Sequence, residues 1–363
     1  MEQKRLLSLD AFRGFTIAAM ILVNDPGSWS HIYPPLEHAA WNGLTPTDLI
    51  FPFFLFIVGV SIALSYTKSL QKGVSKKVLY RKILFRTFKI FLVGLLLNYI
   101  QHFKLSELRY AGVLQRIAIV FLFGSILFLN MKQKALLWTG GLILVFYWLA
   151  MVLIPTPGYS KAILEPGMNL AAWIDSRLLP GKLWQGTWDP EGILSTFPAL
   201  VTCIMGILTG QLLLNKEKED RKVIWMFTLG TAAAITGYIW GLFFPVNKNI
   251  WTSSYVLVTG GFAMILLAAS VFRVDMLQRT RIARFGIIFG SNAITMYVLA
   301  DLLTFIFYRL PIAGAGISEH FMSLADISFF SPEFLSMVYA LLYVGILFIP
   351  AWWLYKRKIF IKL

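Results

Sequence analysis

The sequence has few charged residues and almost no cysteine, and each shortage excludes a class of protein. Charged residues make up 14% of the 363 residues and apolar residues 58%, a balance far from that of a soluble domain. The single cysteine, Cys203, lies within an apolar run, so neither a disulfide framework nor a cysteine-based metal site can form within one chain. Lipid is therefore the expected solvent for most of the chain.

Several motifs are also missing. The sequence has no Gly-rich phosphate loop followed by Lys and Ser or Thr, no paired-histidine metal motif and no Gly-x-Ser-x-Gly elbow, so ATP hydrolysis is not expected and no metal site is predicted. The net charge of +15 is not a sign of nucleic-acid binding, because the Lys and Arg residues lie between apolar runs rather than on one polar face. We expect no nucleic-acid partner.

What the sequence does contain is long apolar runs along its whole length. At ~20 residues each, they are long enough to cross a hydrocarbon core of roughly 30 Å. The predicted fold class is all-α, a polytopic transmembrane bundle of about ten helices in one domain over residues 1–363, with membrane lipid as its surroundings. The expected helices are 8–24, 47–66, 83–100, 112–129, 135–154, 193–213, 223–243, 253–272, 285–308 and 335–355, with a long outer loop at 155–192.

The basic residues predict the orientation of these helices. Of the 33 lysines and arginines, 22 lie in the two terminal segments and in alternate connections, whereas the other connections hold 7. Because excess positive charge marks the cytoplasmic side, both termini are expected in the cytoplasm. The outer segments then contain all four histidines, which are His31, His38, His102 and His320.

The first apolar run carries polar residues that lipid would exclude. At 100° per residue, Asp10, Arg13 and Asn24 fall within about 60° of one another around the helix axis, so their face is expected to be buried in protein or to line a cavity. Asp10 and Arg13 are three residues apart and can pair, either as a structural ion pair or as part of a site for an anionic ligand. Asn24 is expected near the outer end.

The segment 37–48 is rich in polar and aromatic residues and contains no Lys or Arg. Thr45 followed by Pro46 predicts a helix start, since Thr caps helices and Pro suits the first helical position. Three residues are left without a predicted structural role, namely His38, Trp41 and Asn42. Histidine accepts a proton near neutral pH, and Glu37 or Asp48 is expected to orient it. The alternative is an inert loop histidine.

Four further polar residues lie within the expected spans, namely Arg86, Lys89, Gln115 and Arg116. Arg86 and Lys89 either extend to the inner interface or bind an anionic ligand. Arg116 lies about five residues inside its helix, where a guanidinium needs a carboxylate, a phosphate or several carbonyl groups.

Two outer junctions are also polar. Asp189 and Glu191 precede a predicted helix, whose macrodipole would stabilise them in a purely structural role. The stretch Pro245–Trp251 has two asparagines around a lysine beside tryptophan, a composition common in turns and also suited to sugar hydroxyls. Tryptophans of the long loop fit either an interfacial belt or a sugar site; they are Trp173, Trp184 and Trp188.

Together these motifs resemble the heparan-α-glucosaminide N-acetyltransferase family of transmembrane acetyltransferases, over nearly the whole chain. The stretches that carry the resemblance are Ser8–Gly14, His38–Leu44, Asp48–Pro52, Gly112–Arg116, Asp189–Leu194, Pro245–Trp251 and Asn292. One departure is visible: after Asn292 and Tyr297, the family has a His-Glu pair where this chain has Ala300 and Asp301.

The resemblance implies acetyl transfer across a membrane, from acetyl-CoA to the amine of a glucosamine-type sugar on the outer side. It also implies a homodimer and, for a chain that begins at the first conserved helix, a multi-pass protein of the bacterial cytoplasmic membrane. The family's active-site histidine corresponds to His38 and its neighbouring asparagine to Asn24.

We therefore assign the following expected roles. The catalytic residues are His38 as base, Asn24 as oxyanion donor and Asp48 as orienting group. The residues expected to bind acetyl-CoA are Asp10, Arg13, Arg86, Lys89, Gln115, Arg116 and Asn292. The residues expected to bind the sugar or glycan acceptor are Trp41, Asn42, Asp189, Glu191, Asn247, Lys248, Asn249 and Trp251.

Two alternatives remain open at this point. A transporter or permease for amino sugars would also need ten helices around a polar path, and the Ala300 departure favours it. An O-acetyltransferase of a surface glycan would use the same donor.

Overall fold

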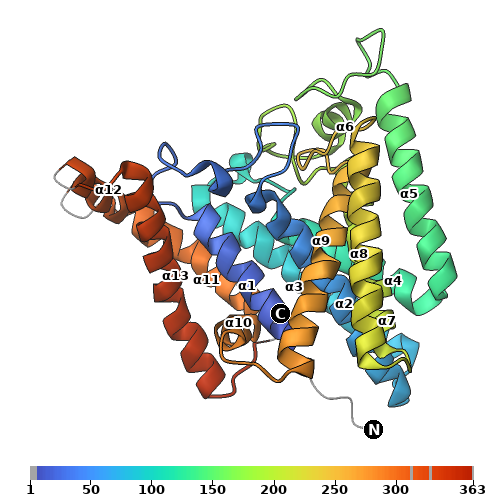
Figure 1. The fold of residues 1–363 in the computed structure, drawn as a ribbon. Coiled ribbons are helices and arrows are strands. Elements are labelled where there is room, and N and C mark those ends of the chain that lie inside the picture. The colour runs from blue at the N-terminus through green and yellow to red at the C-terminus, as the bar shows by residue number, and fades with distance from the viewer. Residues whose placement is uncertain (1–5, 311–313, 327–328, 362–363) are drawn as a thin grey trace. The chain divides into compact units, whose positions relative to one another are not determined.

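The computed structural model describes residues 6–310, 314–326 and 329–361, and their regular elements are helices (Figure 1). Within these residues, nine helices are long and apolar enough to cross a membrane, and the number rises to ten if a bent pair of helices counts as one span. The prediction of an all-α, multi-pass membrane protein is confirmed. Lys4, Arg5 and Lys362, which contributed to the predicted orientation, lie outside the described residues.

Contacts divide the described chain into two units, which we call the first and the second unit. The first contains Ala40–Leu44 and Pro52–Ala269, and the second contains residues 6–39, 45–51 and the described part of 270–361. The first unit has α2 (Ile50–Gln71, whose first two residues belong to the second unit), α3 (Lys76–His102), η3 (Leu105–Glu107), α4 (Val113–Asn130), α5 (Gln133–Leu153), α6 (Leu170–Leu178), α7 (Ile193–Leu214), α8 (Glu219–Gly241) and α9 (Ser253–Ser270).

The helices of the second unit are fewer, and several are short. They are α1 (Leu7–Asn24), η1 (Pro34–Leu36), η2 (Pro46–Leu49), η4 (Val271–Met276), α10 (Ala283–Gly290), α11 (Ala293–Thr304), η5 (Phe305–Arg309), α12 (Ile317–Met322), η6 (Ser323–Asp326) and α13 (Pro332–Lys356).

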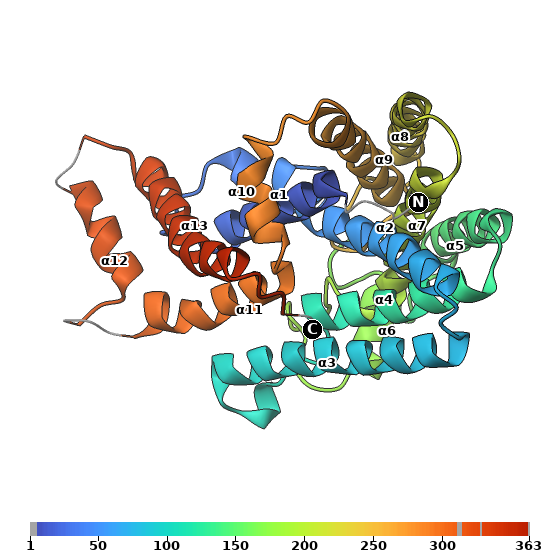
Figure 2. The same cartoon turned by 90° about the horizontal axis from the view of Figure 1, so that it is seen from below.

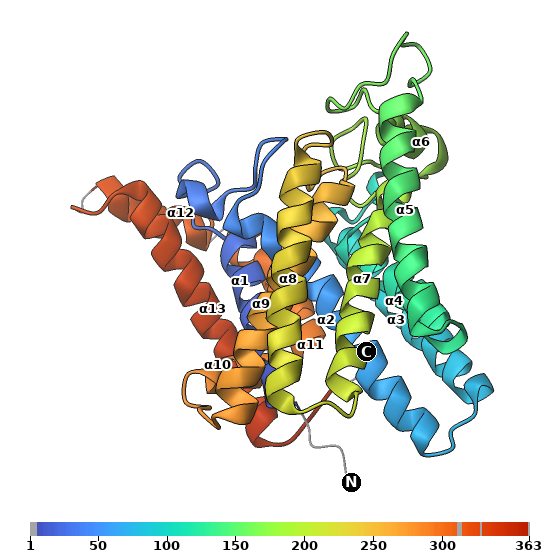
Figure 3. The same ribbon diagram turned by 45° about the vertical axis from the view of Figure 1, so that its right-hand side comes forward.

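In the first unit, α3 and α4 lie side by side (Figure 2), and α7 packs against both α4 and α5 (Figure 3). Glycine brings α2 and α7 into backbone contact. A Cβ atom on Gly59 would lie 2.0 Å from the carbonyl oxygen of Cys203, and one on Gly206 would lie 2.0 Å from that of Phe56. Small residues at such positions let membrane helices approach closely. The resulting packing compensates for the weak hydrophobic driving force for helix association in lipid.

We expect Gly206→Leu to destabilise the protein by roughly 3 kcal/mol or more, because no side chain fits between these two backbones. Gly141→Leu is the matched control, since a Cβ on this α5 glycine meets nothing within 4 Å. Thermal unfolding of the two variants in detergent measures the difference. Equal midpoints would contradict the backbone contact between α2 and α7.

In the second unit, α1 packs against α10 and α13 (Figure 1). The helix predicted at 285–308 is wrong as a single element: α10 and α11 are bent by 80° at Ser291–Asn292. Asn292 leaves the helical conformation, with φ −133° and ψ 41°. Its amide instead binds the C-terminal segment, donating to the Ile359 carbonyl at 2.9 Å and accepting from the Ile361 N–H at 2.8 Å.

The predicted loop 155–192 also contains a helix, α6. Asn169 caps it, with its side-chain oxygen accepting from the N–H of Ala172 at 2.9 Å. At nine residues, this helix lacks the long apolar period by which sequence analysis recognises helices.

Candidate functional site

In the second unit, the structure pairs His38 with Asp48. The Nδ1 atom of His38 lies 2.7 Å from Oδ1 of Asp48. The histidine side chain is 47% exposed, whereas that of Asp48 is 1% exposed. Of the two acids expected to orient the histidine, Asp48 is the one that binds the ring.

The loop around Asp48 holds its carboxylate in place. Its Oδ2 atom accepts from the N–H of Ala39 at 3.0 Å, and from the N–H and the hydroxyl of Thr45 at 3.1 and 3.0 Å. Helix η2 begins at Pro46, directly after Thr45, so the predicted helix start is confirmed. Since these donors stabilise a carboxylate, they favour the charged form that orients the imidazole.

This arrangement fixes the tautomer of a neutral His38. A carboxylate at Nδ1 favours the tautomer in which the proton is on Nδ1. The Nε2 atom is then the basic nitrogen. An exposed imidazole with a buried, hydrogen-bonded acid behind it is suited to take a proton from an incoming nucleophile.

The polar residues of α1 lie at its two ends. Asp10 is buried and accepts from Arg13 at 3.2 Å, which confirms that the two can pair. Arg13 also donates to the Gly290 carbonyl at 3.5 Å. Asn24 is exposed, so the burial expected for this face is found at the Asp10 end and not at Asn24.

In the first unit, Trp41 and Asn42 both have structural partners, so the expectation that they lack a structural role is wrong. The indole N–H of Trp41 donates to the Leu164 carbonyl at 3.0 Å, and its ring packs edge-on against Trp188. The side-chain oxygen of Asn42 accepts from Asn247 at 3.1 Å. These partners are 123 and 205 residues away in sequence, too far for local patterns to reveal.

The connection Pro245–Trp251 is built around buried groups. Asn247 is 0% exposed and bonds to Ile250 and Thr252 as well as Asn42. Trp251 is also buried, and its indole donates to Thr202 at 3.2 Å. Both residues therefore stabilise the connection through buried hydrogen bonds. Its partly exposed polar members are Lys248 and Asn249.

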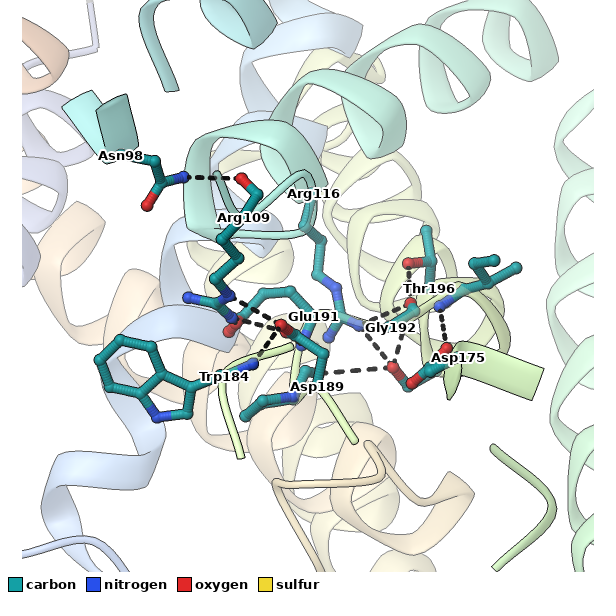
Figure 4. Close-up of polar contacts among 12 residues, drawn as sticks. Asn98, Arg109, Arg116, Asp175, Trp184, Asp189, Glu191, Gly192 and Thr196 are labelled. Atoms are coloured by element: carbon teal, nitrogen blue, oxygen red, sulfur yellow. Dashed lines mark hydrogen bonds and ion pairs between the residues drawn. The ribbon is translucent and has the colours of Figure 1, made fainter. Parts of the chain in front are cut away.

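The junction before α7 contains an ion-pair network that sequence analysis missed (Figure 4). Arg109 binds Asp189 through two hydrogen bonds of 2.7 and 2.6 Å and also contacts Glu191. Burial raises the pKa of Asp189, but hydrogen bonds from Arg109 outweigh it and hold the value below its usual range. The sequence predicted only the helix macrodipole as a stabilising partner of Asp189 and Glu191, and no feature of the sequence identified Arg109.

An exposed tryptophan, Trp184, contacts the same network. Its backbone N–H donates to Asp189 at 3.1 Å, and the Arg109 guanidinium lies 5.0 Å from the centre of its ring. The residues expected to bind substrate here, Asp189 and Glu191, therefore position Arg109 and Trp184.

Arg116 lies buried beside this network. It donates to the Gly192 carbonyl at 3.1 Å and to the Ser195 hydroxyl, and its guanidinium lies 5.2 Å from the Trp251 ring centre. Its Nε and Nη1 atoms and the side-chain nitrogen of Gln115 are buried without a hydrogen-bond partner among the described residues. Carbonyl and hydroxyl oxygens thus supply some of the hydrogen-bond acceptors that the buried guanidinium was expected to require.

Asp175, on α6, binds the first N–H of α7. Its Oδ1 atom accepts from Ile193 at 2.8 Å, and a Cβ atom on Gly192 would lie 1.9 Å from its Oδ2 atom. Burial raises the pKa of this carboxyl to about 7. The folded chain therefore binds a proton here that the unfolded chain releases near pH 4.

We expect this proton to make stability depend on pH. The stabilisation is fully present below about pH 4 and is lost as the pH rises through about 7, a change of roughly 4 kcal/mol. Asp175→Asn should remove most of the slope between about pH 4 and pH 7, measured by unfolding in detergent. Asp189 contributes to the pH dependence of stability in the opposite direction, but its contribution changes only below about pH 4, outside this window. An unchanged slope in the variant would contradict the burial of a neutral Asp175.

The remaining expected donor-binding residues differ in their accessibility. Arg86 is exposed, with its guanidinium 4.9 Å from the Phe121 ring centre, and Lys89 lies 5.1 Å from that of Phe85. Asn292 is buried and occupied by the C-terminal segment. In the part of the chain that the structure describes, no group of three His, Cys, Asp or Glu residues could hold a metal ion.

Comparison with known proteins agrees with the motifs. Residues 5–238 match the family described as heparan-alpha-glucosaminide N-acetyltransferase, catalytic. The chain belongs to this family. Similar proteins include the heparan-alpha-glucosaminide N-acetyltransferase of Homo sapiens, 32% identical over 325 residues that cover 72% of this chain and 48% of the relative. That of Mus musculus is 30% identical over 319 residues, with the same coverage. The chain spans about half the length of these curated relatives.

Proposed function

We propose that the chain transfers an acetyl group from cytoplasmic acetyl-CoA to the amine of a glucosamine-type sugar on the outer side of the bacterial cytoplasmic membrane. The pairing of an exposed His38 with a buried Asp48 carries this proposal. Membership of a family named for N-acetyl transfer supports the reaction class. The excess of Lys and Arg on one set of connections supports the orientation.

Three residues of the second unit would perform the chemistry. Acetyl-CoA supplies the activated acyl carbon. The Nε2 atom of His38 accepts a proton that the amine loses on attack, and Asp48 stabilises the resulting imidazolium. The exposed amide of Asn24 donates to the oxygen on which negative charge develops.

The basic residues of α3 fit the anionic end of the donor. Exposed Arg86 and partly exposed Lys89 each lie against an aromatic ring, an arrangement suited to phosphates and to an adenine ring. Arg13 is neutralised by Asp10, and Arg116 is buried against its own chain. We assign the phosphate contacts to Arg86 and Lys89 first.

The acceptor would meet polar and aromatic groups of the outer segments. Lys248 and Asn249 are the accessible polar members of their connection, and Trp41 is partly exposed. Amide groups and indole rings are the usual partners of sugar hydroxyls and of sugar C–H faces. We also propose a homodimer, as the family resemblance implies.

The test uses purified protein in proteoliposomes, with radiolabelled acetyl-CoA inside and glucosamine outside. N-acetylglucosamine as the labelled product supports the proposal. An O-acetylated product would identify an O-acetyltransferase. Uptake of labelled glucosamine without acetyl-CoA, and without product, would identify a transporter and overturn the proposal.

A further inference from the structure

The chain between His38 and Asp48 leaves the second unit and returns to it. Contacts assign residues 40–44 to the first unit, whereas the residues on both sides belong to the second. We call residues 40–44 the crossing segment, and the residues that flank it, Ala39 and Thr45, its two ends. The proposed base and its orienting acid therefore lie on either side of a short stretch that belongs to the other unit.

One carboxylate holds both ends of the crossing segment and also the catalytic histidine. The Oδ2 atom of Asp48 accepts from the N–H of Ala39 at 3.0 Å and from the N–H of Thr45 at 3.1 Å. The hydroxyl of Thr45 also donates to the Glu37 carbonyl, at 2.7 Å. The Oδ1 atom of the same carboxylate binds His38 at 2.7 Å. Because the two oxygens belong to one rigid group, a shift of either end is transmitted to the oxygen that orients the imidazole.

Within the first unit, Asn42 joins the crossing segment to the connection before α9. Its side-chain oxygen accepts from the side-chain nitrogen of Asn247 at 3.1 Å. Asn247 is 0% exposed, and its own side-chain oxygen accepts from the N–H of Ile250 at 3.1 Å. Both ends of the Asn247 amide are therefore used, and the bond to Ile250 leaves the nitrogen facing Asn42. A residue buried in this way does not meet a sugar, but it can hold Asn42.

The residues on either side of Asn42 are held by the first unit as well. The N–H of Gly43 donates to the Val246 carbonyl at 2.8 Å, and the indole of Trp41 donates to the Leu164 carbonyl at 3.0 Å. Gly43 has a φ of 122°, a conformation that residues with a Cβ atom rarely adopt. Three successive residues of the crossing segment thus each have a fixed partner, so the path of the chain between its two ends is fixed too.

We propose that Asn247, acting through Asn42, positions the catalytic histidine and its acid for proton transfer. This inference rests on the proposed function, because it takes His38 as the base. The two asparagines are then positioning residues and not the acceptor-binding residues that the sequence predicted. Proton transfer to a base depends on a hydrogen-bond distance to the reacting amine, and a misplacement of about 1 Å costs up to ~10²-fold in rate.

Asn42→Ala tests the inference, because this side chain is exposed and its removal breaks the bond to Asn247 without emptying a buried site. With glucosamine as acceptor, kcat should fall roughly 5- to 30-fold, while the KM for glucosamine changes less than about twofold. Asn42→Asp keeps an oxygen that accepts from Asn247, so its kcat should stay within about threefold of wild type. A wild-type kcat in Asn42→Ala would overturn the inference, and a raised KM beside it would assign Asn42 to the acceptor instead.

A double variant tests whether the two asparagines act as a unit. Asn247→Ala should lower kcat at least as much as Asn42→Ala does, and adding Asn42→Ala to it should cause no further loss, because the same hydrogen bond is already gone. Losses that multiply would contradict this coupling. The matched control is Asn130→Ala, which breaks another exposed side-chain hydrogen bond of the first unit, to Tyr80 at 2.7 Å. It should leave kcat unchanged, and a loss equal to that of Asn42→Ala would count against a specific positioning role.

Hydrogen exchange separates this inference from the function, because it needs no acetyl transfer. The N–H groups of Ala39, Gly43 and Thr45 are all hydrogen-bonded, and mass spectrometry of peptides that cover residues 36–48 reports their exchange in detergent. In Asn42→Ala this exchange should be about fivefold faster, the effect of losing one ordinary hydrogen bond, and in Asn130→Ala it should be unchanged. Faster exchange in a chain that acetylates nothing would refute the function and retain the link from Asn42 to the ends of the segment. Unchanged exchange in Asn42→Ala would refute that link.

Discussion

His38→Ala should reduce acetyl transfer by roughly 10²- to 10⁴-fold, the usual contribution of a general base. Without the imidazole, the buried carboxylate of Asp48 no longer orients a base. The folded structure should survive, because the side chain is 47% exposed. Transfer of radiolabelled acetyl groups in proteoliposomes measures the loss, and CoA binding to the same preparation should remain unchanged.

His31→Ala is the matched control for this prediction. Its side chain is 44% exposed and also lies near an acid, with Glu333 at 3.5 Å, but that acid is 37% exposed rather than buried. We expect wild-type activity. Full activity in His38→Ala would remove the proposed base. Asp48→Asn should give an intermediate loss, because the amide no longer selects the tautomer with a basic Nε2.

Arg109→Met should destabilise the protein by about 3–5 kcal/mol, because it removes the cation that is paired directly with the buried Asp189 and with Glu191. Methionine fills much of the same volume but cannot pair with a carboxylate. Unfolding of the detergent-solubilised protein measures the change. Asp189→Asn in the same chain should recover part of it by removing one buried charge.

The control for Arg109 breaks an exposed ion pair. Lys182 lies 3.6 Å from Glu107, and its side chain is 55% exposed, so Lys182→Met should change stability by less than about 1 kcal/mol. Equal effects of the two substitutions would show that burial adds nothing to the Arg109 network. A stable Arg109→Met variant would contradict the network outright.

The spans were predictable because lipid imposes one simple pattern, a long apolar run, which a single sequence shows directly. The break at Asn292 was not predictable from the sequence, because the segment that binds its amide, Ile359–Ile361, lies far along the chain. Helix α3 begins at Lys76 rather than at 83, because the added turns are basic rather than apolar and so escape a hydropathy criterion.

In the candidate site too, contacts between residues close in sequence were predictable and contacts between distant residues were not. The short stretch from Thr45 to Asp48 carries its own helix-start chemistry, so the partner of His38 lay within reach of sequence reasoning. Arg109 and Asp189 are 80 residues apart, and neither predicts the other.

The bend between α10 and α11 bears on how the protein can be handled. Asn292 donates one hydrogen bond to Ile359 and accepts one from Ile361, so the integrity of this corner depends on this segment after α13. A purification handle fused there would begin within a few residues of those bonds. Thermal midpoints for all variants above should therefore be compared on chains that carry the handle at the other end, or from which it has been cleaved.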